Sequence, residues 1–274
     1  MSTLNVRASQ FAASIDWQEN LATIGPIIDQ AEVDGVDLLV LPEGVMARFI
    51  DQKERIRELA QPLDGPFVTG AAALTEGKQV TVVVGIHERS ATERPFNTLV
   101  VLRGGRVIEV YRKLHLYDAF NALESDNVTA AEDIPPLVEV NGFQVGLMTC
   151  YDVRFPELAR ILTLNGADVL VLPAAWVKGP LKEHHWRTLV TARALDNTAY
   201  LVASGECGEA NIGQSLIVDP LGVALAQGTE APGSITATLT RDRLDDARRR
   251  LPVLQNYRFN VEATPRALTV VPAS

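Results

Sequence analysis

The stretch QVGLMTCYDVRFPELARILTLNGADVLVL, residues 144–172, decides the fold class. It begins with an apolar run over residues 144–149 and ends with a second one over Asp168–Leu172, and both runs predict buried strands. Between them, Pro156 marks the start of a helix and Gly166 follows its end, the favoured positions for these two residues. A strand, a helix and a second strand in succession predict a mixed α/β protein.

The same alternation continues through the rest of the chain. Trp17–Val33 is predicted to form an amphipathic helix, in which Gly25-Pro26 indicates a kink. Arg103-Gly104-Gly105 and Asn141-Gly142 are turn sequences between apolar runs, so two hairpins are expected. Other strands are expected at Leu4–Phe11, Val36–Leu41, Gln79–His87, Thr198–Ser204, Gln214–Val218 and Val223–Ala226, and another helix at Glu183–Asn197. No repeat or linker divides the chain, so we expect a single domain with a mixed sheet covered by helices; alternation alone also allows a doubly wound sheet or a barrel.

Composition excludes several classes of protein. The 274 residues carry a formal net charge of −9, which argues against binding to nucleic acids or anionic membranes. No apolar run reaches the roughly 18 residues that a membrane span needs. Met1–Phe11 lacks the pattern of a secretory signal, and Cys150 and Cys207 make no disulfide framework. We therefore expect a cytoplasmic protein with free thiols, and a solvated helix face at Arg248-Arg249-Arg250.

Three polar residues lie at the ends of predicted strands. Glu43 follows an apolar run and Pro42, Lys113 follows the strand Arg106–Arg112, and Cys150 follows residues 144–149. Ligands usually bind at the carboxyl ends of strands in α/β sheets, so these side chains can converge. A cysteine at a strand-to-helix turn is an exposed nucleophile with backbone N–H groups nearby for an oxyanion.

The chemistry of these residues leads to two expectations about charge. Burial would raise the pKa of Glu43 and make it a usable base. The helix dipole and Lys113 would favour the thiolate of Cys150. Taken singly, each residue also has an ordinary interpretation: a buried structural cysteine, a loop glutamate and a surface lysine.

Two histidine arrangements offer alternatives. His115 follows Lys113 closely and would be the base of a Cys–His peptidase. His184-His185 resembles part of a metal site, but adjacent residues diverge around a helix and no other ligand cluster accompanies them. We therefore expect no metal and no other cofactor.

Taken together, the motifs resemble those of the nitrilase superfamily of carbon–nitrogen hydrolases. The resemblance covers almost the whole chain and follows the order of the family's motifs. It rests on Leu41-Pro42-Glu43, on Tyr111-Arg112-Lys113-Leu114-His115-Leu116, on residues 146–157 around Cys150, on Arg193-Ala194-Leu195-Asp196-Asn197, and on Gly213-Gln214-Ser215 with Asp219-Pro220-Leu221-Gly222. It implies an α-β-β-α sandwich and a homodimer or larger homo-oligomer.

The resemblance also implies a mechanism for amide hydrolysis. Glu43 would take the proton of Cys150, and the thiolate would attack the carbonyl carbon. Lys113 and the backbone N–H of Tyr151 would hold the oxyanion, and a thioester would follow. The family has a second glutamate after the lysine; Glu124 is the matching candidate and Glu132 the alternative.

The residues after Cys150 narrow the substrate. Cys-Tyr-Asp-x-Arg-Phe-Pro-Glu resembles the branch that includes deaminated glutathione amidases, which implies hydrolysis of deaminated glutathione to 2-oxoglutarate and cysteinylglycine. Such a substrate carries carboxylates, so Arg154 and Lys178 are candidate binding residues, with Trp176 and Tyr151 lining the pocket. Arg154 alternatively braces the turn through an ion pair.

Three other expectations remain open at this point. The nearest alternative function is an omega-amidase or another hydrolase of small aliphatic amides. A non-catalytic scaffold with a decayed site is a remote alternative, because Glu43, Lys113 and Cys150 are all present. The C-terminal tail, residues 251–274, is expected to pack across a subunit interface.

Overall fold

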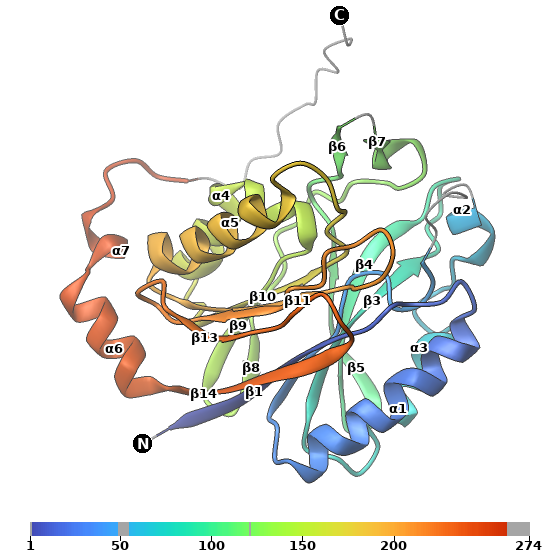
Figure 1. The fold of residues 1–274 in the computed structure, drawn as a ribbon, viewed down its shortest axis with the longest axis horizontal. Helices are drawn as coiled ribbons and strands as arrows, with labels where there is room; N and C mark the ends of the chain where they lie inside the picture. The colour runs from blue at the N-terminus through green and yellow to red at the C-terminus, as the bar shows by residue number, and fades with distance from the viewer. Residues whose placement is uncertain (1, 49–54, 121, 262–274) are drawn as a thin grey trace, which may run out of the picture.

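The computed structural model describes residues 2–48, 55–120 and 122–261. Two six-stranded sheets lie face to face, and helices cover the outer face of each (Figure 1). The first sheet has the order β14-β1-β2-β3-β4-β5 and the second has the order β13-β12-β11-β10-β9-β8. The fold is therefore the α-β-β-α sandwich that the resemblance implied, formed as a single domain.

The bounds of the elements follow the predicted alternation closely. The first sheet consists of β1 (Thr3–Gln10), β2 (Leu38–Val40), β3 (Thr81–Glu88), β4 (Phe96–Arg103), β5 (Arg106–Arg112) and β14 (Gly233–Thr240). The second consists of β8 (Val138–Val140), β9 (Phe143–Leu147), β10 (Val169–Ala174), β11 (Tyr200–Gly205), β12 (Leu216–Val218) and β13 (Ala224–Gln227). Separately, β6 (Asp118–Ala119) pairs with β7 (Ala122–Leu123). The helices are α1 (Trp17–Val33), α2 (Arg55–Leu59), α3 (Pro66–Ala73), α4 (Pro156–Leu164), α5 (Lys182–Asn197), α6 (Arg241–Arg250) and α7 (Val253–Asn256), with 3-10 turns η1 (Glu124–Asp126) and η2 (Cys150–Arg154).

Alternation of side chains along the strands builds two apolar layers. On β2, Leu38 and Val40 face the second sheet, whereas Leu39 faces α1 and α3. Ile24 and Ile28 of α1 cover that outer face. Each such buried side chain stabilises the fold by about 1.5–3 kcal/mol relative to an exposed one. A strand buried on both faces explains the continuous apolar run that the sequence shows there.

Helices α4 and α5 cover the outer face of the second sheet (Figure 1). Gly146 in β9 allows α4 to approach closely, because a Cβ at this position would lie 3.2 Å from Cβ of Leu162. Trp186 and Val190 of α5 are fully buried in the same layer. The close fit of α4 over β9 fixes the segment between them, which contains Cys150.

Several elements were not predicted, the longest of them strand β14 and helix α3. Strand β14 pairs antiparallel with β1, from Thr3 opposite Thr240 to Gln10 opposite Gly233. Only its alternate residues are apolar, and most of it is exposed or half-buried, so its hydrophobic signal is weak. Helix α3 contains Gly70, where a Cβ would lie 2.6 Å from Leu21 of α1. The glycine permits close contact between the helices, but it also lowers the helical propensity that sequence reasoning relies on.

The expectation of a solvated face at Arg248–Arg250 is wrong for Arg248. Its guanidinium donates to Asp168 Oδ1 at 2.9 Å and to the carbonyl of Ala167 at 2.7 Å. Arg249 and Arg250 pair with Asp246, as helical spacing allows. Arg248 therefore fastens α6 to the residues just before β10, whereas Arg249 and Arg250 are exposed on the helix surface, as expected.

Two further points concern the ends and surface of the chain. Among the described helices, none is long and apolar enough to cross a bilayer. The predicted interface tail lies largely outside the described residues, which end at residue 261. In the described part, Phe259 is exposed.

Candidate active site

The three strand ends that the sequence singled out meet at one cavity of about 420 Å³. Glu43 lies three residues beyond β2, Lys113 directly follows β5, and Cys150 lies three residues beyond β9. Both sheets contribute, because β2 and β5 belong to the first and β9 to the second. The cavity is thus built across the interface between the sheets.

The carboxylate of Glu43 accepts three hydrogen bonds. Oε1 accepts from Lys113 Nζ at 2.9 Å and from Asn97 Nδ2 at 2.8 Å, and Oε2 accepts from the backbone N–H of Ala175 at 2.8 Å. Ala175 follows β10, so this bond joins the two sheets. Gly85 on β3 makes room for the loop, since a Cβ there would lie 2.7 Å from the backbone nitrogen of Gly44.

The charge state of Glu43 differs from the sequence expectation. Burial raises the pKa of this carboxyl, as expected, but the Lys113 ammonium together with Arg48 and the Ala175 N–H outweighs burial and brings the pKa to about 2. The net shift is therefore downward and opposite to the expected one, because the attractive charges and hydrogen bonds together exceed the cost of desolvation. Glu43 is a carboxylate that is ready to accept a proton.

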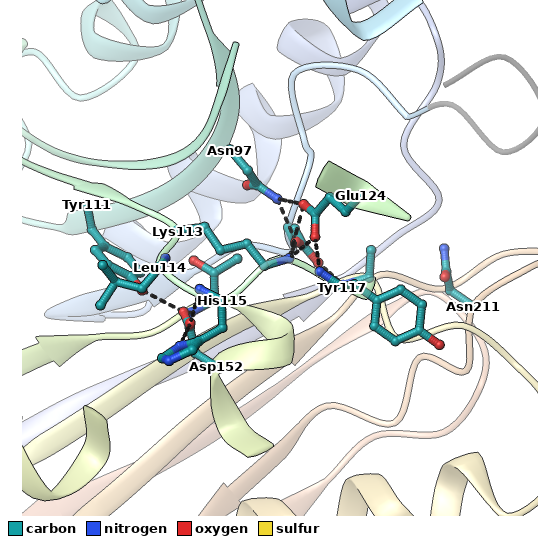
Figure 2. A network of polar contacts seen from close by, with 12 residues as sticks. Asn97, Tyr111, Lys113, Leu114, His115, Tyr117, Glu124, Asp152 and Asn211 are labelled. Atoms are coloured by element: carbon teal, nitrogen blue, oxygen red, sulfur yellow. Dashed lines mark hydrogen bonds and ion pairs between the residues drawn. The ribbon is translucent and has the colours of Figure 1, made fainter. Parts of the chain in front are cut away.

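Lys113 lies between two carboxylates. Its ammonium donates to Glu43 and also to Glu124, at 2.9 Å to Oε2 and 3.2 Å to Oε1 (Figure 2). The side chain is 2% exposed, and although burial lowers its pKa, the charges of Glu124 and Glu43 raise it well above the usual value. An ammonium fixed in this way is a preorganised positive charge for a developing oxyanion.

Glu124 occupies the place of the expected second glutamate. It begins η1, accepts from the Tyr117 backbone N–H at 2.7 Å, and shares Asn97 Nδ2 with Glu43. Glu132, the alternative, is exposed and does not line the described cavity. The geometry therefore places Glu124 beside Lys113.

Cys150 is presented by a strained turn. Its φ of 45° lies in the left-handed region, which non-glycine residues rarely adopt, and it begins η2. The residue is only 6% exposed. Burial and the neighbouring Glu43 carboxylate raise the pKa of the thiol well above its usual value, despite Lys113. Lys113 favours the thiolate, as expected, but burial and Glu43 outweigh it, so the resting site holds a thiol beside a carboxylate.

Asp152 fixes the turn that carries Cys150. This fully buried carboxylate accepts from Thr149 N–H at 2.8 Å, Tyr111 OH at 2.6 Å, and both the N–H and Nδ1 of His115, at 3.2 and 2.7 Å (Figure 2). The His115 ring also stacks on Phe155, with centroids 3.8 Å apart. His115 is thus engaged by the turn and is absent from the described cavity lining, whereas Glu43 lines the cavity together with Cys150.

The predicted substrate-binding residues separate into two groups. Trp176 and Lys178 line the cavity, but Lys178 Nζ already donates to the carbonyls of Gly208 and Glu209, both at 2.9 Å. Tyr151 and Arg154 do not appear among the described lining residues. The Arg154 guanidinium lies over the rings of Trp176 and Tyr151, at 5.0 and 5.8 Å from their centroids, so it contacts a residue of the wall.

Sequence reasoning missed many of the residues that line the cavity, and three of them bear on its charge and hydrogen bonds. Asn97 lies at the start of β4 and bridges the two glutamates, and a polar residue opening an apolar run was the available signal. Arg48 follows Glu43 by five residues, and Lys182 begins α5. Both cations line the cavity, but nothing in their spacing distinguishes them from surface residues. Within the described segments, no group of three or more His, Cys, Asp or Glu is placed to hold a metal.

Comparison with known proteins agrees with this geometry. Residues 5–249 match the model of the carbon-nitrogen hydrolase family. The chain is 49% identical over 254 residues to a deaminated glutathione amidase of Escherichia coli O157:H7, and the match covers 93% of this chain and 97% of that one. It is 32% identical to the human protein of the same name, and that match covers 92% of this chain and 82% of the human one. The fold matches yeast Nit3 of the nitrilase superfamily with a TM-score of 0.83 and 25% identity, covering 94% and 97%. It also matches XC1258 of Xanthomonas campestris, with a TM-score of 0.85 and 24% identity, covering 96% and 100%. The chain belongs to the carbon-nitrogen hydrolase family.

Proposed function

We propose that this protein is a cysteine-dependent amidase that hydrolyses deaminated glutathione to 2-oxoglutarate and cysteinylglycine. The observation that carries the proposal is the convergence of the Glu43 carboxylate, the Lys113 ammonium and the Cys150 thiol on one cavity. The extended identity to deaminated glutathione amidases supports the choice of substrate.

The first half of the reaction forms a thioester. Glu43 accepts the proton of Cys150 as the sulfur attacks the amide carbonyl, which avoids a free thiolate in a buried site. The Lys113 ammonium and the Tyr151 backbone N–H stabilise the oxyanion. Collapse of the tetrahedral intermediate transfers the proton from Glu43 to the departing nitrogen and releases cysteinylglycine.

The second half consumes one water molecule. Glu43 takes a proton from the water, whose oxygen attacks the thioester carbonyl, and the same oxyanion donors act again. The carbon–sulfur bond then breaks, Cys150 recovers its proton, and 2-oxoglutarate leaves. One base serves both halves because Glu43 is a carboxylate at the start of each.

The charge of the cavity supports an anionic substrate. Four cationic side chains line it (Arg48, Lys113, Lys178 and Lys182), against two carboxylates (Glu43 and Glu124). The whole chain carries a formal charge of −9, so the positive excess is local. Deaminated glutathione carries two carboxylates, and complementary charge raises both affinity and the rate of encounter.

The test uses the purified protein and its Cys150→Ala variant with deaminated glutathione, followed by mass spectrometry of both products. Release of 2-oxoglutarate and cysteinylglycine by the wild type alone is the expected result. If the folded wild type releases neither, the substrate assignment is refuted. Preferential hydrolysis of 2-oxoglutaramate, which has the same acyl group but ammonia as its leaving group, would instead support an omega-amidase.

We also propose a cytoplasmic homodimer or larger homo-oligomer. Cys150 and Cys207 are both free, which suits a reducing compartment. Leu195 on α5 and Val223 are exposed, and Leu195 lies beside Gly222, so an apolar surface is available for a second copy. Light scattering of the full chain and of a truncation after Arg250 tests both the assembly and the role of the tail; an unchanged oligomer after truncation refutes the tail's role.

A further inference from the structure

Three cations of the described cavity wall, Lys182, Lys178 and Arg48, form no described ion pair with a carboxylate. Lys178 is exposed, and Arg48 is half-buried and donates to Asn211 Oδ1 at 3.4 Å, whereas Lys182 is nearly fully buried. The residue is 3% exposed, and no ion pair within 4 Å joins it to any described acidic residue. Its single described hydrogen bond is to Tyr117 OH, at 3.1 Å. An ammonium has three donors, so the buried group retains capacity for an acceptor from outside the protein.

Three aromatic rings surround this ammonium. Nζ lies 5.0 Å from the ring centroid of Tyr117, 4.7 Å from that of Phe120 and 4.9 Å from that of Trp176. All three rings line the cavity, and so does Lys182 itself. The rings hold the charge by cation–π attraction and exclude water from it, which strengthens any charged contact made there. They do not neutralise it.

The position of Lys182 in the fold is unfavourable for a cation. It is the first residue of α5, where the helix dipole favours anions, and no side chain caps that end. Burial and the nearby Arg154 lower the pKa of Lys182. An anion beside Lys182 would relieve both effects and would also meet the positive end of α5.

Lys178 and Lys113, by contrast, are already satisfied. Lys178 is clamped to two carbonyls, and Lys113 is held by two glutamates. We propose that Lys182 binds a carboxylate of the substrate and makes the cavity select anionic amides over neutral ones. This inference rests on the proposed amidase activity, but not on deaminated glutathione being the substrate.

The test compares Lys182→Met with the wild type on four amides. Deaminated glutathione carries a carboxylate on both sides of the scissile bond, 2-oxoglutaramate only on the acyl side, pentanoyl-cysteinylglycine only on the leaving side, and pentanamide on neither. Methionine keeps the stem among the rings but removes the charge. We expect kcat/KM to fall by about 10–100-fold, mainly through KM, on each amide with the recognised carboxylate, and to change by less than about threefold on pentanamide.

The pattern across the substrates identifies which carboxylate is bound. A loss on 2-oxoglutaramate assigns Lys182 to the acyl side, and a loss on pentanoyl-cysteinylglycine assigns it to the leaving side. Lys182→Arg should restore most of the preference. Lys78→Met is the matched control, because Lys78 pairs with Asp29 and is not among the described lining residues, and it should leave the ratio of anionic to neutral kcat/KM unchanged.

Two outcomes would overturn the proposal: an equal loss by Lys182→Met on all four amides, or no loss on any. The wild type could fail to hydrolyse deaminated glutathione and still hydrolyse another anionic amide in a Lys182-dependent way. That result would refute the substrate assignment and uphold this inference. A readout without turnover is calorimetry of 2-oxoglutarate and glutarate binding to the Cys150→Ala protein with and without Lys182→Met. Unchanged affinity for both anions would refute a role on the acyl side.

Discussion

Replacing Glu124 with glutamine tests whether Lys113 is held for catalysis by its second carboxylate. The glutamine keeps the size of the side chain but removes one negative charge. It also replaces one acceptor oxygen with an NH₂ donor. In the wild type, both oxygens of Glu124 accept from Lys113 Nζ, at 2.9 and 3.2 Å. Tyr117 N–H and Asn97 Nδ2 point at the same oxygens, so the new NH₂ group faces only donors.

Two magnitudes follow from this geometry. Lys113 keeps its ion pair with Glu43, so the loss of stability is that of one charged hydrogen-bonded partner, about 2–3 kcal/mol. For a domain of this size that lowers Tm by roughly 5–10 °C. If the Lys113 ammonium moves away from the position of the oxyanion, kcat should fall by about 10²–10³-fold, as it does after loss of one preorganised donor.

The assay is single-turnover thioester formation, followed by intact mass, together with steady-state kcat and thermal unfolding. Glu132→Gln is the matched control, because Glu132 is exposed and makes no described ion pair. That variant should stay within about twofold of the wild type. A Glu124→Gln enzyme with kcat within threefold of the wild type, or an equal loss in Glu132→Gln, would refute the reasoning.

Three more predictions concern the residues around the reacting pair. His115→Ala should keep at least about a tenth of wild-type kcat, since this imidazole serves Asp152; complete loss in a folded variant would instead indicate a Cys–His pair. Asp152→Asn should lower the free energy of unfolding by about 2–4 kcal/mol and slow acylation, because the buried carboxylate accepts four hydrogen bonds. An unchanged midpoint in denaturant unfolding would contradict this prediction. Stability should fall as pH drops from 4.5 toward 2, because the pKa of Glu43 is about 2 when folded and near 4.5 when unfolded. The loss attributable to Glu43 is about 3 kcal/mol, and urea midpoints for Glu43→Gln should vary less over that range than those of the wild type.

The fold and the reacting groups were predictable from the sequence because their signals are local. Buried strands make continuous apolar runs in the sequence. The expected ends of Trp17–Val33 and Arg106–Arg112 agree with α1 and β5 to the residue. Glu43, Lys113 and Cys150 follow such strands, so their convergence could be expected without knowledge of any distance.

The surroundings of those groups were not predictable, since they depend on contacts between distant segments. Asn97 is 54 residues from Glu43, and their hydrogen bond exists only because β4 lies beside β3 in the same sheet. Lys182 looked like any lysine at the start of a helix, and only its burial against three rings sets it apart. Arg154 was expected in the pocket, but it lies over the ring of Trp176 and is not among the described lining residues.

The charge states of Glu43 and Cys150 depend on each other. Sequence reasoning treated them separately, one shifted by burial and the other by a neighbouring cation. In the structure Lys113 lies 2.9 Å from Glu43, and the resulting carboxylate opposes ionisation of the thiol. Burial makes a second negative charge beside Lys113 costly. Under the proposed mechanism the proton therefore stays on sulfur until a carbonyl carbon accepts the sulfur's electrons, so deprotonation and attack are coupled and Glu43 serves as base although its pKa is low.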